Sequence, residues 1–121
     1  MILGIVGSRT LNKPLPDEIM PRYIDRIISG SAKGIDTCAR NYALKKHITI
    51  TEIIPEYELY GKRAPIIRND IIINQSDILY IFWDGKSRGS YYVIKKCREL
   101  GKPYRVFTIE NDEYIPMKQV P

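Results

Sequence analysis

The chain has 121 residues, 44% of them hydrophobic and 27% charged, which suits a single domain with a core of its own. No stretch approaches the roughly 20 consecutive apolar residues of a membrane-spanning helix, and Met1–Leu3 begins a strand rather than a signal peptide. We therefore expect a cytoplasmic protein with no membrane partner. The formal net charge of +5 favours an anionic partner such as a nucleotide, nucleic acid or an acidic protein.

Five short stretches rich in apolar and β-branched residues predict strands, and they alternate with helical patterns. The strands are expected at Ile2–Val6, Arg26–Ser29, Ile48–Ile54, Asp77–Trp83 and Tyr104–Thr108, and the helices at Ile35–Lys46, Ala64–Gln75 and Tyr91–Leu100. Between the first two strands, three prolines exclude a long helix and leave at most a turn at Asp17–Met20. Residues 55–62 are expected to form a loop.

This alternation predicts an α/β fold: a Rossmann-like single domain with an about five-stranded parallel sheet and helices on both faces. The expected strand order is 3-2-1-4-5. The domain covers residues 1–110, and residues 111–121 form a loosely held C-terminal tail. In such a sheet, ligands bind beyond the carboxyl ends of the strands, where the strand order reverses.

Cysteine and histidine usage argues against a metal or redox site. Cys38 and Cys97 lie far apart in predicted helices, without a CxxC pair or a Cys/His cluster. We expect two reduced core cysteines, no metal and no cofactor. The single histidine, His47, follows two lysines at a predicted helix end, where a surface role is favoured over catalysis.

The segment Ser29–Asp36 joins a predicted strand to a predicted helix through Gly30, Ser31, Ala32, Lys33 and Gly34. Small residues at the start of a helix let a phosphate approach unpaired backbone N–H groups, and Lys33 adds a full positive charge. This pattern indicates an anion site. The alternative is that the glycines only make a tight turn.

Three more loops carry glycines, small hydroxyl residues and cations to the same edge of the predicted sheet. The candidate ligand-binding residues are Gly7, Ser8, Arg9, Ser29, Gly30, Ser31, Ala32, Lys33, Gly34, Asp36, Arg63, Arg68, Asn69, Asp84, Gly85, Ser87, Gly89 and Ser90. Their convergence predicts a pocket for an anionic ligand. Arg9 either binds that ligand or pairs with a carboxylate. Arg68 and Asn69 either face the site or form a solvated helix face.

The two acids have alternative roles. Asp36 either accepts a hydrogen bond from a ribose hydroxyl or stabilises the helix start. Asp84 either accepts from a ribose, acts as a general acid or base, or caps the next helix. Among the aromatic residues, Tyr57, Tyr60 and Trp83 either stack on a base or, for Trp83 at a strand end, lie in the core.

These motifs resemble the SLOG superfamily, which includes the DNA-processing protein A family and the Lonely guy phosphoribohydrolases. The resemblance rests on Gly7–Arg9, Ser29–Asp36, Arg63–Asn69 and Phe82–Ser90, in that order along the chain, and is closest to the YspA-like branch. It implies a Rossmann-like fold, a nucleotide-derived ligand and a homodimer or larger homo-oligomer. The phosphoribohydrolases carry a glutamate in their second glycine loop, and this sequence has Val93 at that position.

The favoured function is therefore binding of a nucleotide or nucleotide-derived ligand, as a sensor or scavenger. One alternative is an N-glycosidic nucleotide hydrolase of the phosphoribohydrolase type, with Asp84 as its candidate catalytic residue. The third possible function is single-stranded DNA binding, which the net positive charge and the tyrosines support. Nucleic acid is a less favoured partner than a small nucleotide-derived ligand.

Overall fold

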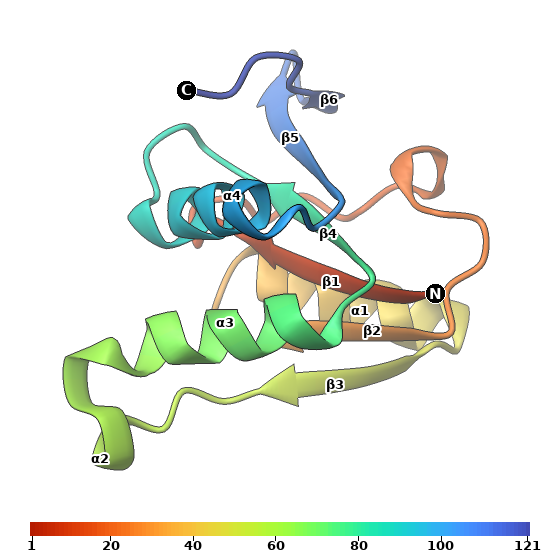
Figure 1. Ribbon diagram of the computed structural model, residues 1–121. Helices are drawn as coiled ribbons and strands as arrows, with labels where there is room; N and C mark the ends of the chain where they lie inside the picture. The colour runs from red at the N-terminus through yellow and green to blue at the C-terminus, as the bar shows by residue number, and fades with distance from the viewer.

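In the computed structural model, which describes residues 1–121, one six-stranded sheet forms the centre of the molecule (Figure 1). Its strands are β1 (Ile2–Gly7), β2 (Arg26–Gly30), β3 (Thr49–Ile53), β4 (Ile78–Phe82), β5 (Tyr104–Glu110) and β6 (Glu113–Pro116). Their order across the sheet is β3-β2-β1-β4-β5-β6, with the first five parallel and β6 antiparallel to β5. The predicted order of the five parallel strands is confirmed.

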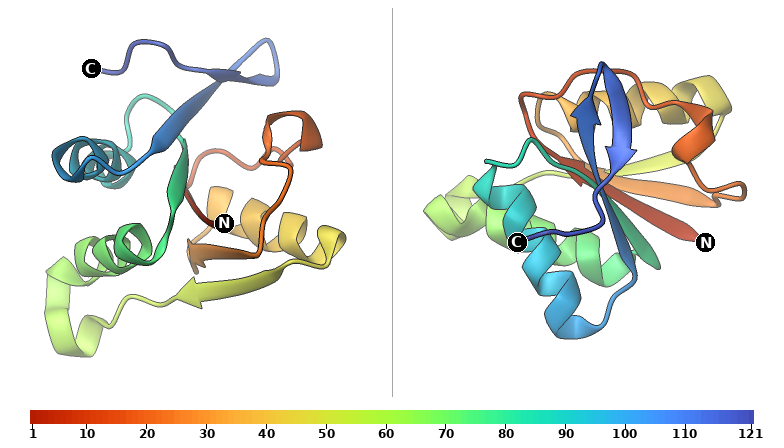
Figure 2. Two further views of the ribbon diagram at one scale, coloured as in Figure 1. Left: turned by 45° about the vertical axis from the view of Figure 1, so that its right-hand side comes forward. Right: turned by 90° about the horizontal axis from the view of Figure 1, so that it is seen from above.

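Helices cover both faces of the sheet, as predicted (Figure 2). The helix α1 (Ile35–Lys46) packs on β1, β2 and β3 from one side, whereas α3 (Ala64–Gln75) and α4 (Arg88–Leu100) pack together on the other side. A short α2 (Tyr57–Tyr60) and the 3₁₀ turns Asp17–Ile19 and Gly61–Arg63 complete the elements. No helix has the length and apolar character needed to cross a membrane.

Strand alternation divides the core into two layers. Leu3 and Ile5 of β1 belong to the layer under α1, while Val6 belongs to the layer under α3 and α4. Both cysteines are buried and free, one in each layer, so the expectation of reduced core cysteines holds. His47 lies exposed at the end of α1 in a left-handed conformation, at the surface position expected for it.

The connection between β1 and β2 contains no α-helix, because its prolines interrupt the backbone hydrogen-bond pattern. This segment still covers the sheet, since Leu15 and Met20 are buried in the layer under α1. The hydroxyl of Tyr114 in the edge strand β6 donates a hydrogen bond to the carbonyl of Lys13, so this segment is connected to the β6 edge of the sheet.

The prediction of a loosely held tail is wrong. Residues 113–116 form β6, and the Tyr114 side chain is buried against Phe82. The two residues between β5 and β6, Asn111 and Asp112, both have positive φ angles, 50° and 62°. A two-residue loop of this kind matches the twist of an antiparallel hairpin, and Asn and Asp adopt it more readily than other residues with side chains. The sheet therefore gains a strand that the hydrophobic pattern does not reveal.

Candidate functional site

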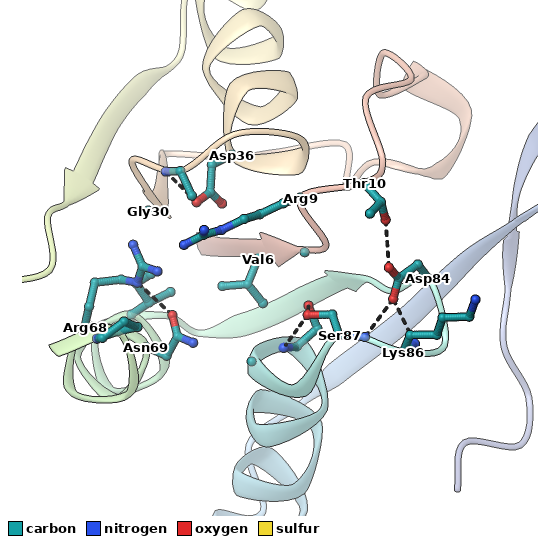
Figure 3. Close-up of a pocket in the computed structure, with 16 residues that line it drawn as sticks. Val6, Arg9, Thr10, Gly30, Asp36, Arg68, Asn69, Asp84, Lys86 and Ser87 are labelled. Atoms are coloured by element: carbon teal, nitrogen blue, oxygen red, sulfur yellow. Dashed lines mark hydrogen bonds between the residues drawn. The ribbon is translucent and has the colours of Figure 1, made fainter. Parts of the chain in front are cut away.

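A polar pocket of about 520 Å³ lies beyond the carboxyl ends of β1, β2 and β4, between the starts of α1, α3 and α4 (Figure 3). The strand order reverses here, because β2 and β4 lie on opposite sides of β1. The volume is within the range of small-molecule sites. Only a few apolar side chains line the pocket, among them Val6 and Ile72.

Most of the predicted site residues line this pocket. They are Gly7, Arg9, Gly30, Ala32, Asp36, Arg68, Asn69, Asp84, Ser87, Gly89 and Ser90. The other predicted residues do not line it: Ser8, Ser29, Ser31, Lys33, Gly34, Arg63 and Gly85. Ser31, Lys33, Arg63 and Gly85 are exposed elsewhere on the surface.

Five lining residues were not among the predicted site residues: Val6, Thr10, Pro65, Ile72 and Lys86. Two of them, Pro65 and Ile72, could have been predicted from their spacing in the sequence. Pro65 and Ile72 lie three residues before and four residues after Arg68 in α3, so helical spacing places them on the same face. Lys86 lies in the loop before α4.

Ser8, Ser29 and Gly34 act as a scaffold beneath the pocket. The backbone carbonyl of Ser8 accepts a hydrogen bond from the N–H of Ile35 at the start of α1. The side-chain hydroxyl of Ser8 accepts one from the N–H of Asp84 at 3.0 Å. Gly34 has a φ of +73°, and a Cβ there would lie 2.6 Å from the carbonyl oxygen of Ser8. The loops after β1 and β2 thus pack backbone against backbone, which only a glycine permits.

Asp36 is a buried carboxylate at the wall of the pocket. Its Oδ1 faces the hydroxyl of Ser29 at 3.1 Å, and its Oδ2 accepts from the N–H of Ala32 at 3.0 Å. Burial raises the pKa of Asp36, although the Ala32 N–H, the charge of Arg68 and Ser29 act in the opposite direction. The carboxylate therefore occupies an N–H group of the loop that the sequence motif offered to a phosphate.

Arg68 and Asn69 form the opposite wall, and both side chains are more than nine-tenths buried. Nε of Arg68 donates to Oδ1 of Asn69 at 2.8 Å, and Nη1 reaches the carbonyl of Ile53 at 3.5 Å. Because arginine only donates, Asn69 must offer its oxygen, and its NH₂ group remains free. Every fully enclosed side-chain nitrogen has a partner, so the unpaired donors of Arg68 and Asn69 open onto accessible space.

Burial lowers the pKa of Arg68, and the charge of Arg9 contributes to the same shift. In Figure 3 the Arg9 side chain runs between Asp36 and Val6, with its guanidinium group turned toward Arg68. Arg9 forms neither an ion pair nor a side-chain hydrogen bond with the protein. Two guanidinium groups thus converge on one pocket without a direct carboxylate partner.

Asp84 fixes the loop between β4 and α4. Its Oδ2 accepts from Thr10 at 2.7 Å, and its Oδ1 accepts from the N–H groups of Lys86 and Ser87, both at 2.8 Å. Burial alone would raise the pKa of Asp84, but these hydrogen bonds outweigh it and lower the pKa to about 2. An aspartate in this state is ionised at neutral pH and cannot act as a general acid there. In the ionised state it can stabilise a positive charge or act as a nucleophile, whereas its low pKa makes it a weak general base.

The start of α4 presents free backbone donors to the pocket. Ser87 caps the helix by accepting from the N–H of Ser90 at 3.4 Å, whereas the N–H groups of Arg88 and Gly89 have no partner in the protein. Gly89 and Ser90 line the pocket. Val93, one turn further along, is fully buried in the core and offers no group to the site.

The aromatic residues do not line the pocket. Trp83 is buried, stacks on Tyr91 and donates through Nε1 to the carbonyl of Ser87, so its core alternative holds. Tyr57 and Tyr60 are exposed on α2. No group of three or more His, Cys, Asp or Glu side chains is placed to hold a metal ion.

The fold and the pocket define an α/β protein with a donor-rich ligand pocket at the reversal point of a mostly parallel sheet. Comparison of the chain with protein-family models, with curated proteins and with solved structures finds no match. The resemblance to the SLOG superfamily therefore stays a prediction from the motifs themselves.

Proposed function

We propose that the protein binds a nucleotide or nucleotide-derived ligand in the pocket between α1, α3 and α4, and that it is a Rossmann-like member of the SLOG superfamily acting in the cytoplasm as a sensor or scavenger. The observation that carries this proposal is the buried guanidinium of Arg68, whose free donors open onto the pocket. A buried cation without a direct carboxylate partner is costly, and an anionic ligand offsets that cost.

The phosphate is proposed to lie at the start of α4. There the N–H groups of Arg88 and Gly89 are free, and the helix dipole adds partial positive charge. Arg9 and Lys86 supply full charges at the same pocket. The start of α1 is the weaker choice, because the Ala32 and Ile35 N–H groups already donate within the protein and the buried carboxylate of Asp36 lies at the same place.

The remainder of the ligand is proposed to extend toward α3. Val6, Pro65 and Ile72 give the pocket a small apolar surface on that side. A sugar or a base packs against such a surface while polar groups fix its orientation. The resemblance also supports a homodimer or larger homo-oligomer, which the hydrodynamic size of the purified protein would test.

Thermal unfolding with added ligands tests the binding proposal. We expect at least one of the four common ribonucleoside 5′-monophosphates at millimolar concentration to raise the Tm by several degrees, because a ligand that binds only the folded state stabilises it by mass action. Inorganic phosphate at the same concentration is expected to give a much smaller shift. Absence of stabilisation by any mono-, di- or cyclic nucleotide would refute the proposal.

A further inference from the structure

The gap between Asp36 and Arg68 has a size that suits one ligand atom. A Cβ on Gly30 would lie 2.5 Å from Nη1 of Arg68 and 2.6 Å from Oδ2 of Asp36, so the two atoms are at most about 5 Å apart. They nevertheless form no direct ion pair. An oxygen atom placed between them lies within hydrogen-bond reach of both, since such bonds span about 2.5–3.2 Å.

Only some chemical groups satisfy both sides of this gap. The carboxylate of Asp36 accepts hydrogen bonds, and the guanidinium of Arg68 donates them. A hydroxyl oxygen donates to the first and accepts from the second. A phosphate oxygen only accepts, and its charge would lie next to a buried carboxylate at an energetic cost.

We infer that Asp36 and Arg68 together bind a free sugar hydroxyl of the ligand through hydrogen bonds. The ligand class is then a ribonucleoside 5′-phosphate with an unesterified hydroxyl. This inference rests on the proposed function and selects Asp36, rather than Asp84, as the ribose acceptor. Asp84 is less suited because three donors, from Thr10, Lys86 and Ser87, already use its oxygens. Asp36 faces only Ser29 and Ala32, so each of its oxygens keeps one acceptor site.

The positions of the two ends of the pocket agree with such a ligand. Asp36 and Gly30 lie at the end of β2, whereas the free N–H groups of α4 follow β4, with β1 between them. Neighbouring strands lie about 4.8 Å apart, so the ends of β2 and β4 are separated by about 10 Å. A sugar that carries its phosphate on the 5′ carbon spans this separation with one hydrogen bond at each end.

The test measures affinity by isothermal titration calorimetry on the full chain. The probes are the four ribonucleoside 5′-monophosphates, each compared with its 2′,3′-dideoxy form. We expect the ribonucleotide that binds best to bind at least tenfold more tightly than its dideoxy form, because loss of the hydroxyl leaves buried polar groups unpaired. A 3′-phosphate added to the same ribonucleotide is expected to weaken binding by at least tenfold as well.

Two variants attribute the effect to this gap. Arg68→Gln is expected to reduce the ribose-to-dideoxyribose ratio to less than threefold, while Lys86→Gln weakens both ligands equally and keeps the ratio. Should Arg68→Gln fail to fold by circular dichroism, the wild-type ratios remain decisive. Equal affinity for ribose and dideoxyribose forms, or tighter binding of the 3′-phosphorylated form, overturns the inference but leaves nucleotide binding intact. No binding of any nucleotide refutes the proposed function and this inference with it.

Discussion

Two loops of this protein have nearly the same composition and different states. The loop after β2, Ser31–Gly34, and the loop after β4, Trp83–Ser87, both combine small residues with a lysine and an aspartate close by, and each leads into a helix. In the first, the aspartate is buried and accepts an N–H group of its own loop. In the second, Asp84 is less buried and accepts the N–H groups of Lys86 and Ser87, while the N–H groups of Arg88 and Gly89 at the start of the following helix stay free.

This difference teaches that a glycine-containing turn before a helix is an anion site only if its donors are unpaired. The loop after β2 is partly closed by protein groups: Asp36 occupies the N–H of Ala32, and the carbonyl of Ser8 occupies that of Ile35. The N–H groups of Asp36 and Thr37 have no partner in the protein, but the buried Asp36 carboxylate lies at the same helix start. The loop after β4 leaves Arg88 and Gly89 available. The first loop therefore serves as a rigid wall, and the second is the better candidate for phosphate.

The largest expected effect tests the rigidity of the first loop. In Gly34→Ala, a Cβ would meet the backbone of Ser8 and Arg9 at 2.6–2.7 Å in a conformation with φ of +73°. We expect a loss of about 2–4 kcal/mol in the free energy of unfolding, from left-handed strain and overpacking together. Urea denaturation followed by circular dichroism measures it.

Gly89→Ala, in the first turn of α4 directly after the second loop, is the matched control. A Cβ at Gly89 would meet nothing within 4 Å, and its φ is not in the left-handed region. Its free energy of unfolding is expected to stay within about 0.5 kcal/mol of the wild type, or to rise slightly, because alanine favours helix more than glycine does. Equal stability of the two variants would show that the first loop is not rigidly packed.

The next effect concerns ligand affinity. Arg9 lines the pocket without a partner, whereas Lys33 in the loop after β2 is exposed and does not line the pocket. For the best-binding ribonucleoside 5′-monophosphate, Arg9→Gln is expected to raise the Kd about tenfold, the scale of one charge-assisted hydrogen bond. Lys33→Gln is expected to change it less than twofold. A larger loss of affinity in Lys33→Gln than in Arg9→Gln, measured by calorimetry at fixed salt, would indicate that the phosphate binds at the loop after β2 instead.

The sequence predicts the sheet well because its signals are local. The strand order and α1, with its bounds at Ile35 and Lys46, agree with the structure, since apolar periodicity predicts these elements and Gly34 directly precedes the helix. The hairpin strand β6 was missed because it has few residues and its burial depends on Tyr114 reaching an aromatic cluster far along the chain. Its signal was the Asn111–Asp112 pair, a known hairpin loop type.

The pocket was predicted more coarsely than the sheet. Sequence order placed the right loops at one edge, but it gave no means of deciding which backbone donors were already satisfied. That decision depends on contacts between segments distant in the chain, such as the carbonyl of Ser8 with Ile35 and the hydroxyl of Thr10 with Asp84. Motif composition identifies where an anion site can form, and only the three-dimensional hydrogen-bond pattern shows whether it is open.

The smallest expected effect separates the two aspartates by pH. The folded state lowers the pKa of Asp84 from 3.8 to about 2, so its stabilising contribution is complete above pH 4 and is lost as the pH falls through 2. After allowance for the partial exposure of Asp84, Asp84→Asn is expected to lower the free energy of unfolding by about 1 kcal/mol at pH 7 and to flatten the stability curve between pH 4 and 2.

Asp36 has a raised pKa, so its contribution to stability has the opposite sign: it is present below pH 3.8 and is lost as the pH rises through the folded-state pKa. Urea midpoints from pH 2 to 7 measure Asp84→Asn and Asp36→Asn, with Glu58→Gln as the control, because Glu58 has no ion pair or side-chain hydrogen bond. If the two aspartate variants shifted the curve in the same direction, the two loops would not differ in the way that their hydrogen bonds indicate.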